Sequence, residues 1–430
     1  MRVTILTVGS RGDVQPYVAL GLGIQAAGHQ VRLATHVEFE PFVRDHGLDF
    51  AVMPGNPFTG LNAGVGQATP DAAPVSATTL TFRQRFEQAL EQWITGGLAA
   101  SQDAEAVIYS QLCFIGYYVA EKLRVPCYAA NHSPLTPTRV FPTIYARNKP
   151  QLGGAYNRLT HFLDQQFFWQ KNRTMLNRLR QKTLGLPPLP FWGPYGRMQR
   201  EQMPVLYGYS PAVVPKPFDW DDWIHVTGFW FLDRPADWQP PADLVAFLEA
   251  GPPPVYLGLG SVANSNPVRV TKAVLEALAQ TGQRVIVMPG RVDLADVDLP
   301  PETYRIGPTH FDWLFPRVAA VITHGGPGTV GLALRAGVPT LAIPFFGDQF
   351  FWGQQIAALG VGPAPIPAAQ VSVEPVAAAV RTMIGDQAMR RRAADLGRQI
   401  QAEDGVVRAV EVLQQHQTNA QHAAHIEVAV

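Results

Sequence analysis

The feature that most constrains the fold of this chain is a strand–turn–helix alternation that begins at residue 3 and begins again near residue 254. Val3–Val8 is an uncharged, largely β-branched run, as expected for a strand buried on both faces of a parallel sheet. A glycine-containing turn at 9–13 follows, and we expect a helix that opens at Pro16 and ends at Gly28. With the next strand at Val31–Thr35, this unit is typical of a doubly wound α/β domain.

The alternation continues through both halves of the chain. In the first half, strands are predicted at 106–109 and 126–130, with a helix at 115–123 between them. In the second half, strands are predicted at 255–259, 284–288, 304–306, 319–323 and 340–343. Helices at about 373–384 and 387–402 and a polar tail are expected to close the chain.

The length sets the number of domains. At roughly 150 residues per domain, 430 residues suffice for two to three. We assign residues 1–205 to an N-terminal domain, 206–240 to a connector, 241–405 to a C-terminal domain and 406–430 to a helix end and polar tail. The connector lies in a stretch rich in proline and tryptophan, which indicates packing against both domains. Residues 54–80, without periodicity, predict a loop.

Charge and cysteine content exclude several classes of protein. The chain has 34 Lys and Arg against 34 Asp and Glu, a balance that argues against a nucleic-acid-binding protein. Two cysteines cannot form a disulfide framework, and no cysteine–histidine cluster predicts a metal site. The apolar run at the N-terminus is too short for a secretion signal, and no stretch reaches the roughly 18 residues of a membrane span. We therefore expect a cytoplasmic protein.

The order of the elements predicts where a ligand binds. Two α/β domains joined by one connector face each other across a cleft, and ligands of such sheets bind at the carboxyl ends of the strands. The expected site is therefore built from the loops at 9–16, 260–266, 324–329 and 344–349.

Two of these loops have features of a diphosphate site. His324-Gly-Gly-Pro-Gly-Thr329 follows a predicted strand and opens a helix, where backbone N–H groups suit an anion. Gly258-Leu-Gly-Ser261 offers a second turn of this kind. The alternative is an ordinary glycine-rich turn with Thr329 as a cap. The dinucleotide pattern GxGxxG occurs at neither turn, which argues against NAD or FAD.

Three polar side chains are candidates for chemistry at the same edge. Asp348 and Gln349 provide acceptors and a donor that suit the hydroxyl groups of a sugar, although both residues also suit the first turn of a helix. Asp13, in the other half, is placed to act as a general base. The alternative for Asp13 is helix capping or an ion pair with Arg11.

Residues 155–182 combine helical apolar spacing with six basic residues and one acid, Asp164. A basic amphipathic helix of this kind lies on a membrane surface or packs on its own domain, and both interpretations stay open here.

Several stretches together resemble a known family. They are VGSRGDVQPYVALGLGIQAAGHQVRLATH (8–36), LTPTRVFPT (135–143), PVLYGYSPAVVPKPFDWDDWIHVTGFWFLD (204–233), DWLFPR (312–317) and ITHGGPGTVGLALRAGVPTLAIPFFGDQFFWGQQI (322–356). On the basis of these stretches, residues 1–405 resemble the UDP-dependent inverting glycosyltransferases of the sterol 3β-glucosyltransferase group. This group is related to the glycopeptide-antibiotic glycosyltransferases.

The resemblance implies a GT-B fold, in which two Rossmann-like domains face each other across a cleft. It implies that the N-terminal domain binds a hydrophobic hydroxyl acceptor and the C-terminal domain a UDP-sugar, which is a substrate rather than a cofactor. The diphosphate would contact His324, Gly326, Gly328 and Thr329, with Ser261 as a further contact. Asp348 and Gln349 would bind the sugar, Trp313 would shape the nucleobase end, and Asp13 would be the base.

The resemblance also has departures and alternatives. Many plant relatives use a histidine as the base, but none occurs at 9–16; His29 and His36 lie further along. The stretch from Gly307 to Trp313 is longer than the Pro-His-Asp-Trp of the family pattern. The family pattern therefore does not fix the nucleobase contacts of His310. The implied reaction is an inverting, metal-independent transfer of a hexose, with glucose expected, to a sterol or other lipid. Polyketide or carotenoid acceptors, a non-catalytic partner protein and a sugar-nucleotide epimerase are the alternatives.

Overall fold

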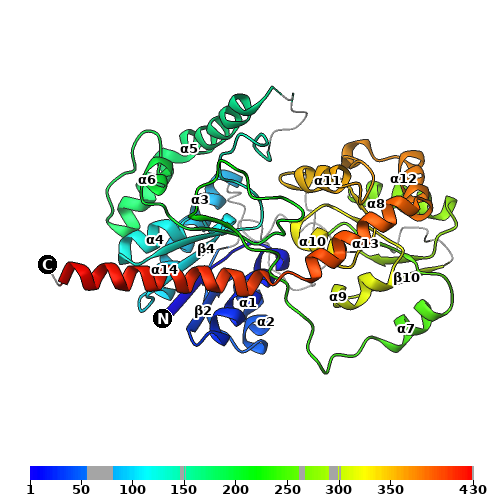
Figure 1. Cartoon of the computed structure of the whole chain (residues 1–430), viewed down its shortest axis with the longest axis horizontal. Helices are drawn as coiled ribbons and strands as arrows, with labels where there is room; N and C mark the ends of the chain where they lie inside the picture. The colour runs from blue at the N-terminus through cyan, green and yellow to red at the C-terminus, as the bar shows by residue number, and fades with distance from the viewer. Residues whose placement is uncertain are drawn as a thin grey trace, which may run out of the picture.

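The computed structural model describes residues 1–55, 81–145, 150, 152–260, 267–289, 299 and 302–428. Figure 1 shows two lobes, each containing a parallel sheet with helices around it. This arrangement is the pair of facing α/β domains that the alternation of strands and helices predicts. The predicted loop at 54–80 lies outside the described residues beyond 55.

The N-terminal sheet has seven parallel strands in the order β3-β2-β1-β4-β5-β6-β7. Its central strands are apolar and buried because helices cover both faces of a parallel sheet. The strands are β1 (Arg2–Leu6), β2 (Gln30–Thr35), β3 (Asp49–Val52), β4 (Ala106–Ser110), β5 (Cys127–Asn131), β6 (Val205–Tyr207) and β7 (Ile224–Val226). The helices are α1 (Arg11–Ala26), α2 (Glu40–Asp45), α3 (Phe82–Ala100), α4 (Gly116–Leu123), α5 (Gly154–Leu184) and α6 (Tyr195–Arg200).

The C-terminal sheet has five parallel strands in the order β10-β9-β8-β11-β12. They are β8 (Val255–Gly258), β9 (Val285–Met288), β10 (Thr303–Arg305), β11 (Ala320–Thr323) and β12 (Thr340–Ala342). The helices are α7 (Ala242–Glu249), α8 (Pro267–Gln280), α9 (Phe311–Leu314), α10 (Pro327–Arg335), α11 (Gln349–Ala358), α12 (Val373–Gly385) and α13 (Gln387–Gln401). Short 3₁₀ turns lie at Val37–Phe39, Gln111–Cys113, Phe315–Arg317 and Ala368–Gln370.

Helix α1 begins five residues earlier than predicted, and Pro16 lies inside it rather than at its start. The cause is a capping box at the start of the helix. Ser10 precedes the helix, and both its backbone N–H and its hydroxyl donate hydrogen bonds to Oδ2 of Asp13 at the third helical position. This local bonding outweighs the backbone hydrogen bond that a proline inside a helix cannot make. The earlier start places Asp13 in the first turn of α1.

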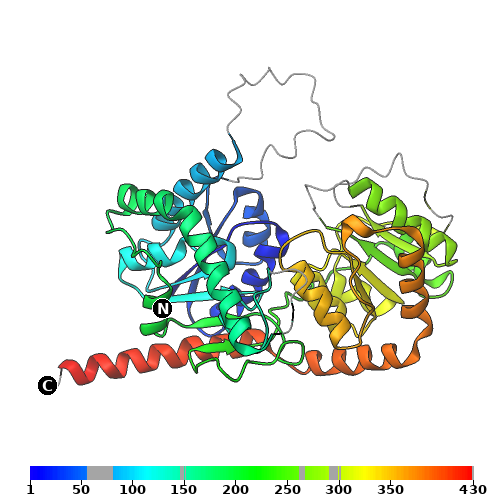
Figure 2. The same cartoon turned by 90° about the horizontal axis from the view of Figure 1, so that it is seen from above.

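Two segments are placed differently from the sequence-based expectation. Strand β7 (Ile224–Val226), within the stretch assigned to the connector, pairs with β6 and extends the N-terminal sheet. The helix end and polar tail expected at 406–430 are helical where the structure describes them, since Gly405–Val428 form helix α14. Helix α14 continues from α13 along the N-terminal domain, as Figure 2 shows, and its Ala409, Val410 and Leu413 are buried in the same core as α1. The boundaries 205, 240 and 405 stay a prediction.

The two domains also share a core. One apolar cluster contains Tyr207 and Trp220 of the N-terminal domain together with Val330, Phe351 and Trp352 of α10 and α11. Because this cluster is continuous, the packing fixes the two sheets with their carboxyl edges toward one cleft.

Candidate functional site

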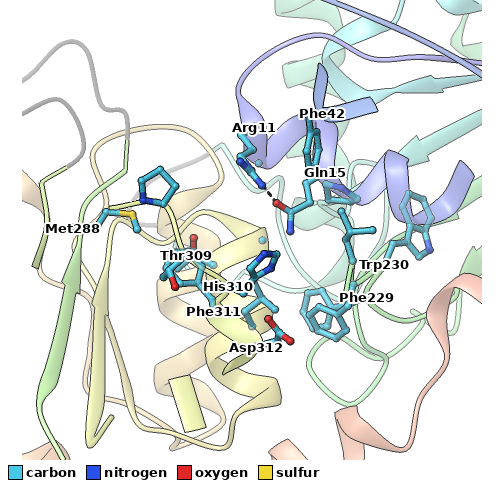
Figure 3. A pocket seen from close by; sticks show the side chains of 18 of the residues that line it. Arg11, Gln15, Phe42, Phe229, Trp230, Met288, Thr309, His310, Phe311 and Asp312 are labelled. Carbon is cyan, nitrogen blue, oxygen red and sulfur yellow. Dashed lines mark hydrogen bonds between the residues drawn. The ribbon is translucent and has the colours of Figure 1, made fainter. Parts of the chain in front are cut away.

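An interdomain cavity of about 860 Å³ lies at the carboxyl edges of the sheets. Figure 3 shows Arg11, Gln15 and Phe42 on the N-terminal side, opposite Met288, Thr309 and His310 on the C-terminal side. The volume is typical of a site for a ligand of moderate size. Both domains therefore line one cavity. Of the loops expected from the sequence, 9–16 and 324–329 contribute to its wall, 344–349 does not, and 261–266 lie outside the described residues.

Asp13 lies in the first turn of α1, next to Gly12, which lines the cavity, but does not itself line it. Its Oδ2 accepts hydrogen bonds from Ser10 N at 2.7 Å and Ser10 Oγ at 2.8 Å. Gly9 permits this, since a Cβ there would lie 2.6 Å from the same oxygen. Burial raises the pKa of Asp13, while the hydrogen bonds from Ser10 oppose that rise. Among the described residues Oδ1 has no hydrogen-bond partner, which leaves one oxygen able to accept a proton.

Asp348 precedes α11 in the C-terminal domain and does not line the cavity. Its Oδ2 accepts a 2.7 Å hydrogen bond from the Oγ of Ser133, which follows β5 of the N-terminal domain. Burial raises the pKa of Asp348, and the negative charge of Asp13 raises it further. The hydrogen bond from Ser133 thus connects this carboxylate to the N-terminal domain.

Gln349 is buried at the first position of α11. Its Oε1 accepts hydrogen bonds from the backbone N–H of Phe345 at 2.8 Å and of Phe346 at 3.3 Å. The side-chain oxygen therefore fixes the loop before α11. Among the described residues the amide nitrogen has no hydrogen-bond partner, and the sugar-binding role expected from the sequence stays a prediction.

His324 is held between two glycines. A Cβ on Gly260 would lie 2.9 Å from the ring Cε1, and a Cβ on Gly326 would overlap Nε2. Thr323 Oγ1 lies 3.3 Å from Nδ1. Burial lowers the pKa of His324 to about 4, so the ring is neutral near pH 7. A neutral imidazole in this position can donate a hydrogen bond to a ligand, but it carries no positive charge.

The N-terminus of α10 opens on the same cavity. Gly326 precedes the helix and Pro327 is its first residue, which suits a proline because the first N–H groups lack partners within the helix. Gly328 and Thr329 line the cavity, and a Cβ on Gly328 would meet no atom within 4 Å. The turn therefore presents backbone donors and the positive end of a helix dipole to a ligand.

The far end of the cavity is aromatic. Trp238 lies in the segment that connects β7 to α7. Its ring centroid lies 4.9 Å from that of His310 and 5.7 Å from that of Trp313. His310 and Trp238 line the cavity. Trp313 supports them and contacts the Arg317 guanidinium at 4.4 Å. Trp313 thus shapes this end through Trp238, and the longer stretch from Gly307 places His310 at the cavity wall.

Sequence reasoning missed two residues at the site, Ser133 and Trp238, and named His132 only as an alternative to Asp13 as the base. Ser133 and His132 follow β5 and belong to no motif, although the carboxyl end of a central strand is a position where ligands bind. His132 lines the cavity, packs on Tyr17 and Trp230, and has a pKa lowered to about 4 by burial. Trp238 was assigned only to the connector. Ser261 lies outside the described residues.

Within the described part of the chain, no group of three or more His, Cys, Asp or Glu is arranged to hold a metal ion. None of the helices in that part is both long and apolar enough to span a membrane.

Family models match both ends of the chain. Residues 3–142 match the glycosyltransferase family 28 N-terminal domain, and residues 272–415 match the erythromycin biosynthesis protein CIII-like C-terminal domain. The chain is 39% identical over 96% of its length to a sterol 3-beta-glucosyltransferase of Aspergillus clavatus, and 40% identical to one of Neosartorya fischeri. It spans only 29% of the length of each.

Solved structures with the same fold are glycosyltransferases. A calicheamicin glycosyltransferase superposes with a TM-score of 0.66 at 19% identity, covering 96% of this chain and 97% of its own. A spinosyn forosaminyltransferase superposes with a TM-score of 0.68 at 16% identity, covering 96% of this chain and 98% of its own. At these identities the likeness establishes the two-domain GT-B fold.

Proposed function

We propose that the chain is a glycosyltransferase of the sterol 3β-glucosyltransferase-like group, to whose members it is similar over 96% of its length, and that it transfers glucose from UDP-glucose to a hydroxyl group of a sterol or other hydrophobic acceptor. One observation carries the proposal: Ser133 of one domain is hydrogen-bonded to Asp348 of the other, next to His132, which lines the cavity on which the N-terminus of α10 opens. In this proposal Asp13 would accept the proton, Asp348 would contact the sugar and the end of α10 would bind the diphosphate.

The donor would bind to the C-terminal domain. Backbone donors at Gly328 and Thr329 and the neutral ring of His324 would face the diphosphate, where charge increases as UDP leaves. Trp238 and His310, supported by Trp313, form the aromatic end where a uracil ring would stack. Asp348 and the amide nitrogen of Gln349 would then contact the sugar hydroxyls.

The acceptor would approach from the N-terminal domain. Its hydroxyl oxygen would form a bond to the anomeric carbon on the face opposite the diphosphate, while the bond from that carbon to the UDP oxygen breaks. This geometry inverts the anomeric centre. The hydroxyl proton would pass to Asp13 Oδ1, and the raised pKa of this carboxyl makes it a better base than an exposed aspartate.

We also propose that the reaction is metal-independent, since helix and side-chain donors would supply the charge stabilisation at the diphosphate.

We further propose a peripheral membrane contact through residues 155–182, because sterols and other lipid acceptors reside in bilayers.

Acceptor-dependent release of UDP tests the proposal. UDP-glucose and other UDP-sugars are each incubated with a panel of sterols, carotenoid alcohols and polyketide alcohols in detergent, with and without EDTA. We expect UDP release from UDP-glucose with a sterol, unchanged by EDTA. Conversion of the UDP-sugar without any acceptor would indicate an epimerase, and absence of turnover with every pair would indicate a non-catalytic protein.

A further inference from the structure

His132 is held in the cavity wall by the packing of two aromatic rings. It follows β5 and lines the interdomain cavity. Its ring centroid lies 4.9 Å from that of Tyr17 and 5.7 Å from that of Trp230, and the centroids of these two neighbours lie 5.8 Å apart. The Tyr17 hydroxyl donates a 2.6 Å hydrogen bond to the carbonyl of Ala130. Trp230 Nε1 donates one of 3.0 Å to Oγ1 of Thr227. The polar ends of both neighbours are therefore used elsewhere, and their rings fix His132 before any ligand binds.

Neither ring nitrogen of His132 is used within the described part of the chain. Nε2 is buried without a hydrogen-bond partner, and no residue that the structure describes bonds to Nδ1. Nδ1 is not buried, so on a partly exposed ring that lines the cavity it opens on the cavity. Burial lowers the pKa of His132 to about 4, so the ring is uncharged near pH 7. The cavity wall thus presents a neutral nitrogen that is ready for a hydrogen bond.

A hydroxyl group is the partner that suits this nitrogen best. A neutral imidazole has one N–H and one bare nitrogen, and a hydroxyl can accept a hydrogen bond from the first or donate one to the second. A diphosphate only accepts hydrogen bonds and is charged, so the N–H groups at the start of α10 suit it better than an uncharged ring does. The chemistry of Nδ1 therefore favours a hydroxyl over a phosphate.

The cavity wall beside His132 is apolar. Figure 3 shows Trp230, which contacts the ring of His132, on the N-terminal side of the cavity, as Gln15 is. The lining residues that follow β6 and β7 are Gly208, Phe229, Trp230, Phe231 and Leu232. A polar atom in such a wall suits a ligand that is largely apolar and has a hydroxyl group. A sugar suits it less, because each of its hydroxyls would need a partner of its own when it leaves water.

We propose that Nδ1 of His132 forms a hydrogen bond with the hydroxyl group of a sterol acceptor and selects acceptors by that group. The inference rests on the proposed function and deepens it, since it names a residue that binds the acceptor hydroxyl. Ser133, the next residue, bonds to Asp348 at 2.7 Å, so the segment after β5 would serve both substrates. Asp13 lies one helical turn before Tyr17 on α1, and would take the proton from the same hydroxyl.

Binding of two sterols that differ by one hydroxyl tests the inference without any reaction. Radiolabelled cholesterol and 3-deoxycholesterol, which lacks the hydroxyl, are delivered from cyclodextrin to the full chain with UDP and no sugar donor. We expect the parent to bind cholesterol about threefold to tenfold more tightly, the usual effect of a hydrogen bond. His132→Phe keeps an aromatic ring against Tyr17 and Trp230 but has no nitrogen, so most of this preference should disappear. His132→Asn places an amide near the position of Nδ1 and should restore most of it.

His225→Phe is the matched control. In the part of the chain that the structure describes, Nε2 of His225 is likewise buried without a partner, and burial likewise lowers the pKa of this ring to about 4. His225 does not line the cavity, so His225→Phe should keep the parent preference for cholesterol. The melting temperature of each variant is measured on the same preparation. The preference of the parent needs no substitution and so does not depend on how a variant folds.

The outcomes separate this inference from the proposed function. A parent that binds both sterols equally, or a His132→Phe protein that keeps the parent preference, would overturn the inference. So would a His132→Phe protein in which the KM for UDP-glucose rises while the preference stays, because the ring would then contact the donor. A parent that prefers cholesterol through His132 but releases no UDP with it would contradict the proposed function and leave the hydroxyl contact standing.

Discussion

The hydroxyl of Ser133 donates a hydrogen bond to the carboxylate of Asp348, with Oγ and Oδ2 2.7 Å apart. The two residues are 215 positions apart in sequence and belong to different domains. The same hydroxyl lies 3.4 Å from Nε1 of Trp352. Ser133 thus joins the N-terminal domain to the residue proposed to contact the transferred sugar.

Ser133→Ala should impair use of the sugar. The change removes the 2.7 Å hydrogen bond to the partly buried Asp348 carboxylate, at a cost of about 1–3 kcal/mol. We expect the KM for UDP-glucose to rise while the Kd for UDP changes little. Ser210→Ala is the matched control, since Ser210 Oγ donates a 2.7 Å hydrogen bond to Glu403 and is also fully buried. It should lower the melting temperature without a selective effect on the sugar. If each variant changed the KM for UDP-glucose and the Kd for UDP by the same factor, the hydrogen bond from Ser133 would have only a structural role.

Gln349→Glu separates the two ends of that side chain. A glutamate keeps an oxygen that can accept from the N–H groups of Phe345 and Phe346, so the melting temperature should stay near that of the parent. It lacks the amide nitrogen proposed to donate to the sugar, so kcat/KM for UDP-glucose should fall. Gln349→Ala should lower both quantities. Parent-like kinetics in Gln349→Glu would exclude the amide nitrogen from sugar binding.

His324→Ala should weaken binding of UDP by about tenfold to a hundredfold, the usual effect of losing a hydrogen bond to a charged group. Calorimetric titration with UDP measures this directly. Because burial lowers the pKa of His324 to about 4, the ring stays neutral from pH 5.5 to 8, and its contribution should be constant over that range. A contribution that grows as the pH falls through 6.5 would show instead that the ring binds as a cation.

The raised pKa of Asp13 predicts a pH-dependent stability. A carboxyl with a higher pKa in the folded than in the unfolded protein holds its proton more tightly when folded. Its stabilising contribution is therefore complete below the ordinary pKa of 3.8 and is lost as the pH rises through the higher folded value. Asp13→Asn, which stays uncharged, should gain melting temperature relative to the parent between pH 4 and 7. A relative loss over that range would show that the folded pKa of Asp13 is not raised.

Much of the fold was predictable because it depends on local pattern. Short buried β-branched runs and the helices between them fixed most strands to within a residue or two, as at β2 and β11. The start of α1 was wrong because Pro16 was given more weight than the Ser10–Asp13 pair. Helix α14 was not predicted because its apolar residues are few and become buried only on distant segments, namely α1 at the opposite end of the chain and the strands that carry Tyr128 and His225.

The site was predictable where strand ends carry motifs. The glycines around His324 and the residues at 348–349 lie where the order of strands places them. Ser133 and Trp238 were not predictable, since each acquires its role from a residue of the other domain or of a distant segment. A hydrogen bond across 215 positions has no local signature in one sequence.

Turnover by Asp13→Asn tests the central claim most directly. Asparagine caps a helix nearly as well as aspartate, so the variant should fold, and its melting temperature is measured on the same preparation. General-base catalysis typically contributes about 10²–10⁴-fold. The rate of acceptor-dependent UDP release should therefore fall by about that factor, with the Kd for UDP unchanged. A folded Asp13→Asn protein that releases UDP at the parent rate would contradict the account.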